Sequence, residues 1–359
     1  MIAILPVVAL LISLAIFFSL AKPRKLPSSR GEAKAISIII PARDEEENIG
    51  HLLKTLRDQS TRPLEIIVVD DQSGDRTAQV ARDFGATVVA GKELPGGWKG
   101  KTWACQQGAD AATGDWLLFL DADLKFLPEA LARLASLTTE DKIQSVCPYH
   151  RVQRTYEQLS AYFNAITLAG VDAFALTPSP EATLFGQVLL IRRDLYQRAG
   201  GHKAVRHEIL ENYRLARLIR EQGGTIQHSL GRGAIEMRMF PDGLPHLIQS
   251  WKKGFLAGAS QAPGRALLTT SLWLTGGMIL TGSLCSLPLF SSFYLWTTLS
   301  ASLGYTLVSF YAFRLAGNFS FFTALFFPVA LLFYQALFFK SLLDQKKGRQ
   351  QTWKGRSIS

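Results

Sequence analysis

The sequence predicts an α/β domain with a mostly parallel, Rossmann-like sheet, joined to apolar helices at both of its ends. Five apolar, β-branched runs alternate with segments of helical length, which is typical of a parallel sheet covered on both faces. Uncharged stretches of membrane-spanning length flank this region. Acidic residues follow three of the apolar runs, so carboxylates are expected along one edge of the sheet, where ligands of such folds collect.

The alternation can be assigned segment by segment. The expected strands are 36–41, 65–71, 86–90, 116–121 and 143–149, and the expected helices are 45–58, 75–84, 101–112 and 128–136.

The apolar ends predict membrane insertion. Residues 2–20 carry no charge and are followed by basic residues, so residues 1–22 are expected to be a retained anchor, with a cleaved signal peptide as the alternative. Between Arg265 and Lys340 the only charge is Arg314. That length divides into apolar segments near 267–288, 291–313 and 319–339, which predicts two to three transmembrane helices. Their topology stays open, because three crossings would place the basic C-terminus outside.

The charge distribution supports the same layout. Residues 1–35 and 340–359 carry +4 and +5 of the net charge of +10, which favours contact with anionic lipid and argues against a nucleic-acid groove. The three cysteines show no metal-binding spacing, which fits a reduced, cytoplasmic setting. We expect a multi-pass protein of the cell membrane whose α/β domain faces the cytoplasm. Its predicted segments are an anchor (1–22), a basic linker (23–35), the α/β domain (36–240), an amphipathic interfacial region (241–264), a transmembrane region (265–342) and a basic tail (343–359).

The first two acidic strand ends place carboxylates at the edge of the predicted sheet. At "PARDEEENI", Asp44 and Glu46 follow a strand; capping of a helix by Asp44 is the alternative, although it leaves Arg43 unexplained. At "VVDDQSGDRT", Asp71 can accept hydrogen bonds from a ribose hydroxyl or a base N–H, and the alternative is helix capping by Ser73 or Asp75.

The third acidic strand end suits a metal. In "FLDADLKF", Asp121 and Asp123 supply oxygen ligands of the kind that Mg²⁺ or Mn²⁺ prefers, and such a cation bridges to nucleotide phosphates. A solvated turn is the alternative for this pair taken alone. As the third of a series of acidic strand ends, the pair favours the metal.

Six motifs in order carry a resemblance over residues 36–262: "SIIIPARDEEENI", "VVDDQSGDRT", "GWKGKTWACQQGA", "FLDADLKF", "GQVLLIRRDLYQRAGG" and "FPDGLPHLIQSWKKGF". Together they resemble the family 2 inverting glycosyltransferases, which have the GT-A fold. Within the family, the chain is most similar to membrane enzymes that glycosylate isoprenoid lipids such as carotenoid acids and hopanoids.

The resemblance implies a nucleotide-diphosphate sugar donor, usually UDP-linked, and a divalent metal (Mg²⁺ or Mn²⁺) held by Asp123 with Asp121. Trp251 with Lys252 or Lys253 would shield and neutralise the leaving diphosphate. An amphipathic helix lying on the membrane is the alternative for that segment. The residues that the resemblance assigns to the nucleotide sugar are Pro41, Arg43, Asp44, Glu46, Asp71, Lys101, Asp121, Gly186, Gln187 and Lys253.

One departure from the family concerns the general base. The usual Glu-Asp pair is here Glu211 followed by Asn212, and an amide cannot take a proton. Glu211 is the candidate base, with Glu208 or His207 in reserve, while an ordinary amphipathic helix start is the alternative for both glutamates. An acceptor that is already ionised, such as a carotenoid carboxylic acid giving a glycosyl ester, needs little help from a base.

We therefore expect a membrane-bound inverting glycosyltransferase that moves a sugar, with glucose expected, from a UDP-sugar to an apolar isoprenoid lipid. The alternatives are a polyprenyl-phosphate or other membrane-lipid glycosyltransferase, and a non-catalytic protein that binds nucleotide or lipid. Residues 156–176 are apolar at helical spacing and form either ordinary core or one wall of an acceptor groove.

Overall fold

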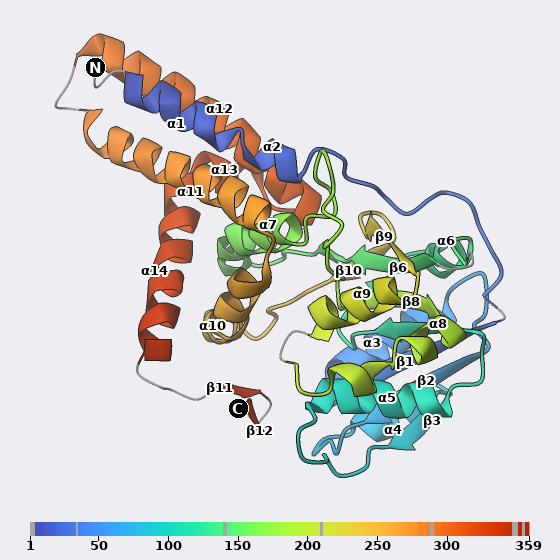
Figure 1. Ribbon diagram of the computed structural model, residues 1–359. Helices are drawn as coiled ribbons and strands as arrows, with labels where there is room; N and C mark the ends of the chain where they lie inside the picture. The colour runs from blue at the N-terminus through green and yellow to red at the C-terminus, as the bar shows by residue number, and fades with distance from the viewer. Residues whose placement is uncertain are drawn as a thin grey trace. The chain divides into compact units, whose positions relative to one another are not determined.

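The computed structural model describes residues 4–33, 35–138, 142–208, 211–287, 291–346, 351–353 and 356–358. The chain divides into two compact units (Figure 1). The α/β unit comprises Arg24–Tyr149, Thr183–Arg238 and the C-terminal residues from Gln350. The helical unit comprises Met1–Pro23, His150–Ala182 and Met239–Arg349. Residues 150–182 therefore belong to the helical unit, although in the sequence they stand between two parts of the α/β unit.

The α/β unit is built on a seven-stranded sheet in the order β3-β2-β1-β4-β8-β6-β9. β8 is antiparallel to both of its neighbours, while β3, β2, β1 and β4 pair in parallel, as do β6 and β9. The expected mostly parallel, Rossmann-like sheet is thus confirmed, with one reversed strand inserted. The strands are β1 (Ile36–Ala42), β2 (Glu65–Asp70), β3 (Thr87–Ala90), β4 (Trp116–Leu120), β6 (Lys142–Cys147), β8 (Val188–Arg192) and β9 (Thr225–Leu230).

Helices and a small second sheet complete the α/β unit. The small sheet has the order β5-β10-β7. The remaining elements are α3 (Glu46–Arg57), α4 (Thr77–Asp83), α5 (Gly100–Ala111), α6 (Ala130–Ala135), α8 (Arg193–Arg198), a 3₁₀ helix (His202–Val205), α9 (Glu211–Glu221), β5 (Leu124–Phe126), β7 (Tyr149–His150), β10 (Ile235–Met237), β11 (Gln351–Trp353) and β12 (Arg356–Ile358).

Local sequence explains α3, the helix that follows the first strand. Its buried side chains recur at helical spacing and form one apolar face: Ile49, Leu52, Leu53 and Leu56. Two glutamates occupy its first turn and two basic residues its last turn. Each charge is opposite in sign to the end of the helix dipole beside it, which stabilises the helix. The helix begins after Glu45 rather than after Asp44, so the capping role that was the alternative for Asp44 is not observed.

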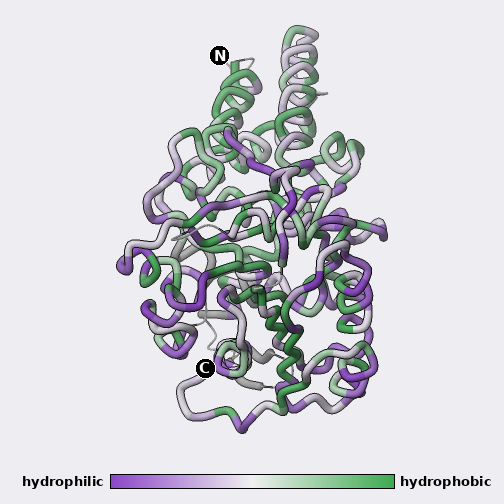
Figure 2. Tube along the Cα trace, turned by 90° about the vertical axis from the view of Figure 1, so that its right-hand side faces the viewer, coloured by the Kyte–Doolittle hydropathy of each residue, from purple (hydrophilic) through white to green (hydrophobic). Residues whose placement is uncertain are grey.

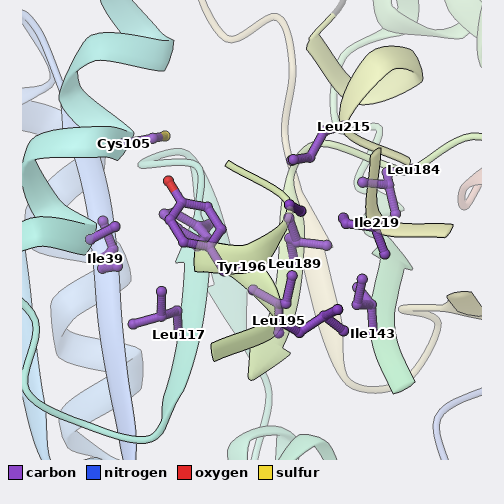
Figure 3. Close-up of a cluster of buried hydrophobic side chains, with 14 of the residues drawn as sticks. Ile39, Cys105, Leu117, Ile143, Leu184, Leu189, Leu195, Tyr196, Leu215 and Ile219 are labelled. Carbon is purple, nitrogen blue, oxygen red and sulfur yellow. The ribbon is translucent and has the colours of Figure 1, made fainter. Parts of the chain in front are cut away.

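The core lies between the sheet and its helices. Figure 3 shows Tyr196, Leu189 and Leu195 lying between Leu117 and Ile143 in a continuous cluster of buried side chains. α5 packs against β1 and β2. This close approach depends on Gly108, since a Cβ there would lie 2.4 Å from Ile39 Cγ2.

The helical unit contains the apolar ends of the chain. Each of the three C-terminal apolar segments forms helix, and α11 and residues 327–344 of α14 are long and apolar enough to cross a membrane. The N-terminal apolar helix, Leu5–Ser19, is shorter. The helices are α1 (Leu5–Ser13), α2 (Ile16–Ser19), a 3₁₀ helix (Thr155–Ser160), α7 (Ala161–Gly170), α10 (Leu244–Gln261), α11 (Gly264–Cys285), α12 (Ser292–Ala316), α13 (Phe321–Leu325) and α14 (Phe327–Lys346).

Hydropathy differs between the two units. Figure 2 shows hydrophobic colouring along the helices of the helical unit, whereas in the α/β unit it concentrates on the strands. Phe293, Trp296 and Leu303 of α12 leave 68%, 66% and 54% of their surface exposed. Such exposed apolar groups suit a lipid surface. α7, in contrast, is largely buried. Its burial agrees with the first of the two interpretations of residues 156–176, ordinary core.

Candidate active site

A cavity of about 230 Å³ opens at the carboxyl ends of the central strands of the α/β unit. This is the edge at which open α/β sheets bind their ligands. The cavity joins the three acidic strand ends that the sequence separates. Its lining residues are Pro41, Ala42, Arg43, Glu45, Asp71, Gly100, Lys101, Ala104, Asp121, Ala122 and Asp123.

Arg43 and Asp71, which follow β1 and β2, both line the cavity. Asp71 is buried, and its backbone N–H donates to the carbonyl of Ala42 at 2.8 Å, which continues the parallel register beyond the strands. Arg43 Nη1 donates to the backbone carbonyl of Asp71 at 2.8 Å and lies 4.0 Å from its carboxylate. The Arg43 guanidinium thus links the end of β1 to the end of β2. This contact gives Arg43 a role that helix capping left unexplained.

Asp44 and Glu46 do not line the cavity. Asp44 has a left-handed backbone (φ 51°), and its carboxylate accepts a hydrogen bond from the Gly74 N–H at 2.7 Å. Glu46 accepts one from the Arg76 N–H at 3.1 Å. Both tie together the loops after β1 and β2, and the side chain that faces the cavity is Glu45. No pattern within three consecutive glutamates marks which of them points inward.

Lys101, in the first turn of α5, lines the cavity beside the third acidic strand end. Its Nζ forms an ion pair with Asp121 at 2.6 Å and donates to the Gly186 carbonyl at 3.4 Å. Burial alone would lower the pKa of Lys101, but the carboxylates of Asp121 and Glu211 outweigh burial and hold that pKa above its ordinary value. Lys101 is therefore a permanent cation at the centre of the site.

Asp123 is the carboxylate best suited to a metal. Burial raises the pKa of Asp123 to about 7, and the charges of Asp121 and Glu45 act in the same direction. Negative charge thus accumulates at this point, where a cation would relieve the repulsion. Within the described part of the chain, no three His, Cys, Asp or Glu side chains converge to hold a metal by themselves. Two aspartates fit Mg²⁺ or Mn²⁺, which often take their other ligands from phosphates and water.

A smaller cavity adjoins the first through Pro41, Lys101 and Asp121, and its other lining residues are Cys105, Phe119, Leu120, Gly186, Leu189, His202, Glu211 and Asn212. Burial raises the pKa of Glu211, although the Lys101 ammonium opposes the shift. A carboxylate with a raised pKa is suited to general-base catalysis near neutral pH.

The two reserve bases lie outside both cavities. The ring of His207 packs against Gly97, where a Cβ would be 2.5 Å from its Cε1. Glu208 follows directly and lines neither cavity.

His202 is a site residue that the sequence interpretation missed. It is 5% exposed, and its Nδ1 lies 2.8 Å from the hydroxyl of Tyr196. Burial, with a smaller contribution from the Lys101 charge, lowers the pKa of His202 to about 3, so the ring is neutral at pH 7. The sequence feature that marks this turn is the glycine pair before His202, because Gly200 and Gly201 both have a positive φ, of 81° and 57°.

The two remaining donor-site candidates in the α/β unit, Gly186 and Gln187, directly precede β8. Gly186 lines the smaller cavity, whereas the side chain of Gln187 lines neither. The Gln187 carbonyl accepts a hydrogen bond from the Asp121 N–H at 3.0 Å, so this residue acts through its backbone.

The Trp251 segment belongs to the helical unit. Trp251 stacks on Phe163 with ring centroids 4.7 Å apart, and Lys252 pairs with Asp344 at 2.5 Å. The side chain of Lys253 lies outside the described residues. Their predicted action on the diphosphate stays a prediction.

Known proteins are similar to this chain in sequence. Residues 37–213 match the family model described as Glycosyl transferase family 2. The chain is 34% identical over 333 residues to 4,4'-diaponeurosporenoate glycosyltransferase of Staphylococcus aureus (strain MRSA252), covering 91% of this chain and 88% of the relative. The same enzyme of strain USA300 is 33% identical over equal coverage.

A solved structure resembles the fold. It is a mannosyltransferase from Pyrobaculum calidifontis in complex with GDP-Man and Mn²⁺, with a TM-score of 0.50 and 18% identity. The match covers 86% of this chain and 99% of that one.

Proposed function

Because the chain belongs to family 2 of the glycosyltransferases, we propose that it transfers a sugar from a nucleotide-diphosphate donor to an apolar isoprenoid acid at the membrane. UDP-glucose is the expected donor. The acceptor class is suggested by the carotenoid acid in the printed name of the Staphylococcus aureus relative.

The observation that carries the proposal is the cavity at the sheet edge, where Asp71, Lys101, Asp121 and Asp123 converge. A nucleotide diphosphate needs groups that accept from its nucleoside and groups that neutralise its phosphates. Asp71 would accept from the nucleoside, and Lys101 would approach the phosphates. Asp123 with Asp121 would hold Mg²⁺ or Mn²⁺, which when bound neutralises negative charge on the diphosphate.

The reaction is proposed to invert the anomeric centre. The acceptor oxygen attacks the anomeric carbon from the side opposite the diphosphate, which leaves with the electrons of the broken C–O bond. An alcohol must also lose a proton, which Glu211 would accept. An ionised acid needs no such step.

Membrane attachment is proposed for the helical unit. α11 and α14 are of spanning length, and α12 exposes large apolar side chains. Basic residues flank the apolar segments, which favours a multi-pass arrangement with the α/β unit in the cytoplasm.

The test uses the full chain in detergent with radiolabelled UDP-glucose, Mn²⁺ and retinoic acid, a polyene carboxylic acid. A labelled, alkali-labile ester is the expected product, and it should be absent with Asp123→Ala. Label transferred to polyprenyl phosphate alone would instead identify a polyprenyl-phosphate glycosyltransferase. If the full chain neither transfers nor hydrolyses any of several nucleotide sugars, an enzymatic function is refuted.

A further inference from the structure

Asn212 stands where the family usually has an acidic residue, and the structure gives its amide a specific setting. We propose that the Asn212 side chain anchors the ionised carboxylate of the acceptor and so selects an acid over an alcohol. The inference rests on the proposed function and assigns the acceptor end of the same site.

The amide of Asn212 is available for a ligand. Asn212 is the second residue of α9, is half-buried and lines the smaller cavity with Lys101 and Glu211. Among the described residues, its side chain has no hydrogen-bond partner. An amide N–H placed in a cavity beside an ammonium group suits an anionic oxygen, because hydrogen bonds to charged groups are the stronger ones.

Gly186 is what admits the amide. A Cβ on Gly186 would lie 2.3 Å from Asn212 Nδ2 and 2.8 Å from Oδ1, so a larger residue would displace the side chain. The carbonyl of the same glycine accepts from Lys101 Nζ at 3.4 Å. The amide of Asn212 and the cation of Lys101 therefore both lie close to Gly186, in the same cavity.

Charge explains why an amide is preferable to a carboxylate here. Lys101 already faces Asp121 and Glu211. An aspartate at position 212 would add another negative charge and repel an ionised acceptor, whereas the neutral amide donates to it. Specificity of this kind is a difference between two binding free energies, and removing a repulsive group contributes to it as much as adding an attractive one.

The chemistry balances without a base. The acceptor carboxylate oxygen forms the new bond to the anomeric carbon, the bond from that carbon to the diphosphate oxygen breaks, and the nucleoside diphosphate carries away the negative charge. No proton is transferred. With an alcohol, the same displacement releases one proton, and Asn212 cannot accept it.

The experiment compares retinoic acid with retinol, an acid and an alcohol on the same polyene, as acceptors for wild type, Asn212→Asp and Asn212→Ala in detergent with UDP-glucose. Both variants should lose roughly tenfold to a hundredfold in kcat/KM for the acid. Retinol turnover should fall less, or rise with Asn212→Asp. Arg217→Gln, an exposed position on α9, is the matched control and should keep the wild-type ratio.

Two further measurements separate a selective effect from a folding defect: thermal unfolding, and donor hydrolysis without acceptor. If a variant unfolds, Asn212→Ser keeps one donor and should keep part of the acid preference. An unchanged acid-to-alcohol ratio in Asn212→Ala overturns the anchoring role and leaves the proposed function intact. Loss in Asn212→Asp alone assigns selection to repulsion, which also overturns anchoring. A wild type that hydrolyses UDP-glucose but glycosylates neither polyene refutes the acceptor class itself.

Discussion

Replacing Lys101 with methionine removes the central cation of the site while keeping an apolar stem of similar length. The change leaves Asp121 without the ammonium that lies 2.6 Å away. The pair is partly exposed, with 34% of the Lys101 side chain and 24% of the Asp121 side chain accessible. Exposed pairs contribute about 0–1 kcal/mol, and breaking a fully buried pair costs about 3–5 kcal/mol. A loss of about 2 kcal/mol in unfolding free energy is therefore expected.

For a domain of this size, such a loss lowers Tm by roughly 4–8 °C. The matching assay is thermal unfolding in detergent without donor. The double variant Lys101→Met with Asp121→Asn should recover most of the stability, because no unpaired charge remains.

Activity should respond differently from stability. Lys101 is expected to meet the donor phosphates, so Lys101→Met should lower kcat/KM for donor hydrolysis by roughly a hundredfold. The double variant should not regain that activity. Lys203→Met, which removes an exposed lysine in the same unit, is the control and should leave both Tm and activity unchanged. A stable, fully active Lys101→Met would refute the reasoning on both counts.

Three further predictions concern the metal, pH and packing. Asp123→Ala should abolish stimulation of donor hydrolysis by Mn²⁺, and a persisting Mn²⁺ response would contradict its role as ligand. The pKa of His202 is about 3 when folded and about 6.5 when unfolded. The unfolded chain therefore binds the extra proton as pH falls through this window, and stability should drop by roughly 2 kcal/mol at pH 5, as measured by urea unfolding. His202→Asn should flatten this pH dependence, and an equally steep dependence would exclude His202 as its source. Gly108→Ala places a Cβ 2.4 Å from Ile39 Cγ2 and should destabilise by about 1–2 kcal/mol. Gly96→Ala, with open space around its Cβ, should be nearly neutral, and equal Tm values for the two variants would argue against tight packing of α5.

The order and type of the central elements could be read from the sequence. The runs that became β1, β2 and β4 are continuously apolar because both faces of the sheet are covered. Since parallel strands bring their carboxyl ends to one edge, Asp71 and Asp123 could be expected near each other. Both line the larger cavity.

The sequence was less informative where pairing depends on distant segments. β8 enters the sheet between β4 and β6 in the opposite direction, and its run of four apolar residues has the same pattern in either orientation. Residues 150–182 pack with the helical unit, although in the sequence they stand between two parts of the α/β unit. The helical spacing of residues 156–176 does not show which of the two units they join.

By itself, the sequence determined the alternation of strands and helices, the apolar ends and the acidic edge, because each is encoded by local periodicity or composition. Only the tertiary structure decided which side chains meet. The backbone at Asp44 turns Glu45 rather than its neighbours into the cavity, Lys101 pairs with Asp121 across two elements, and Asn212 fits against Gly186. Such contacts depend on loop dihedrals and on distances between segments far apart in the chain, and no local pattern records either of them.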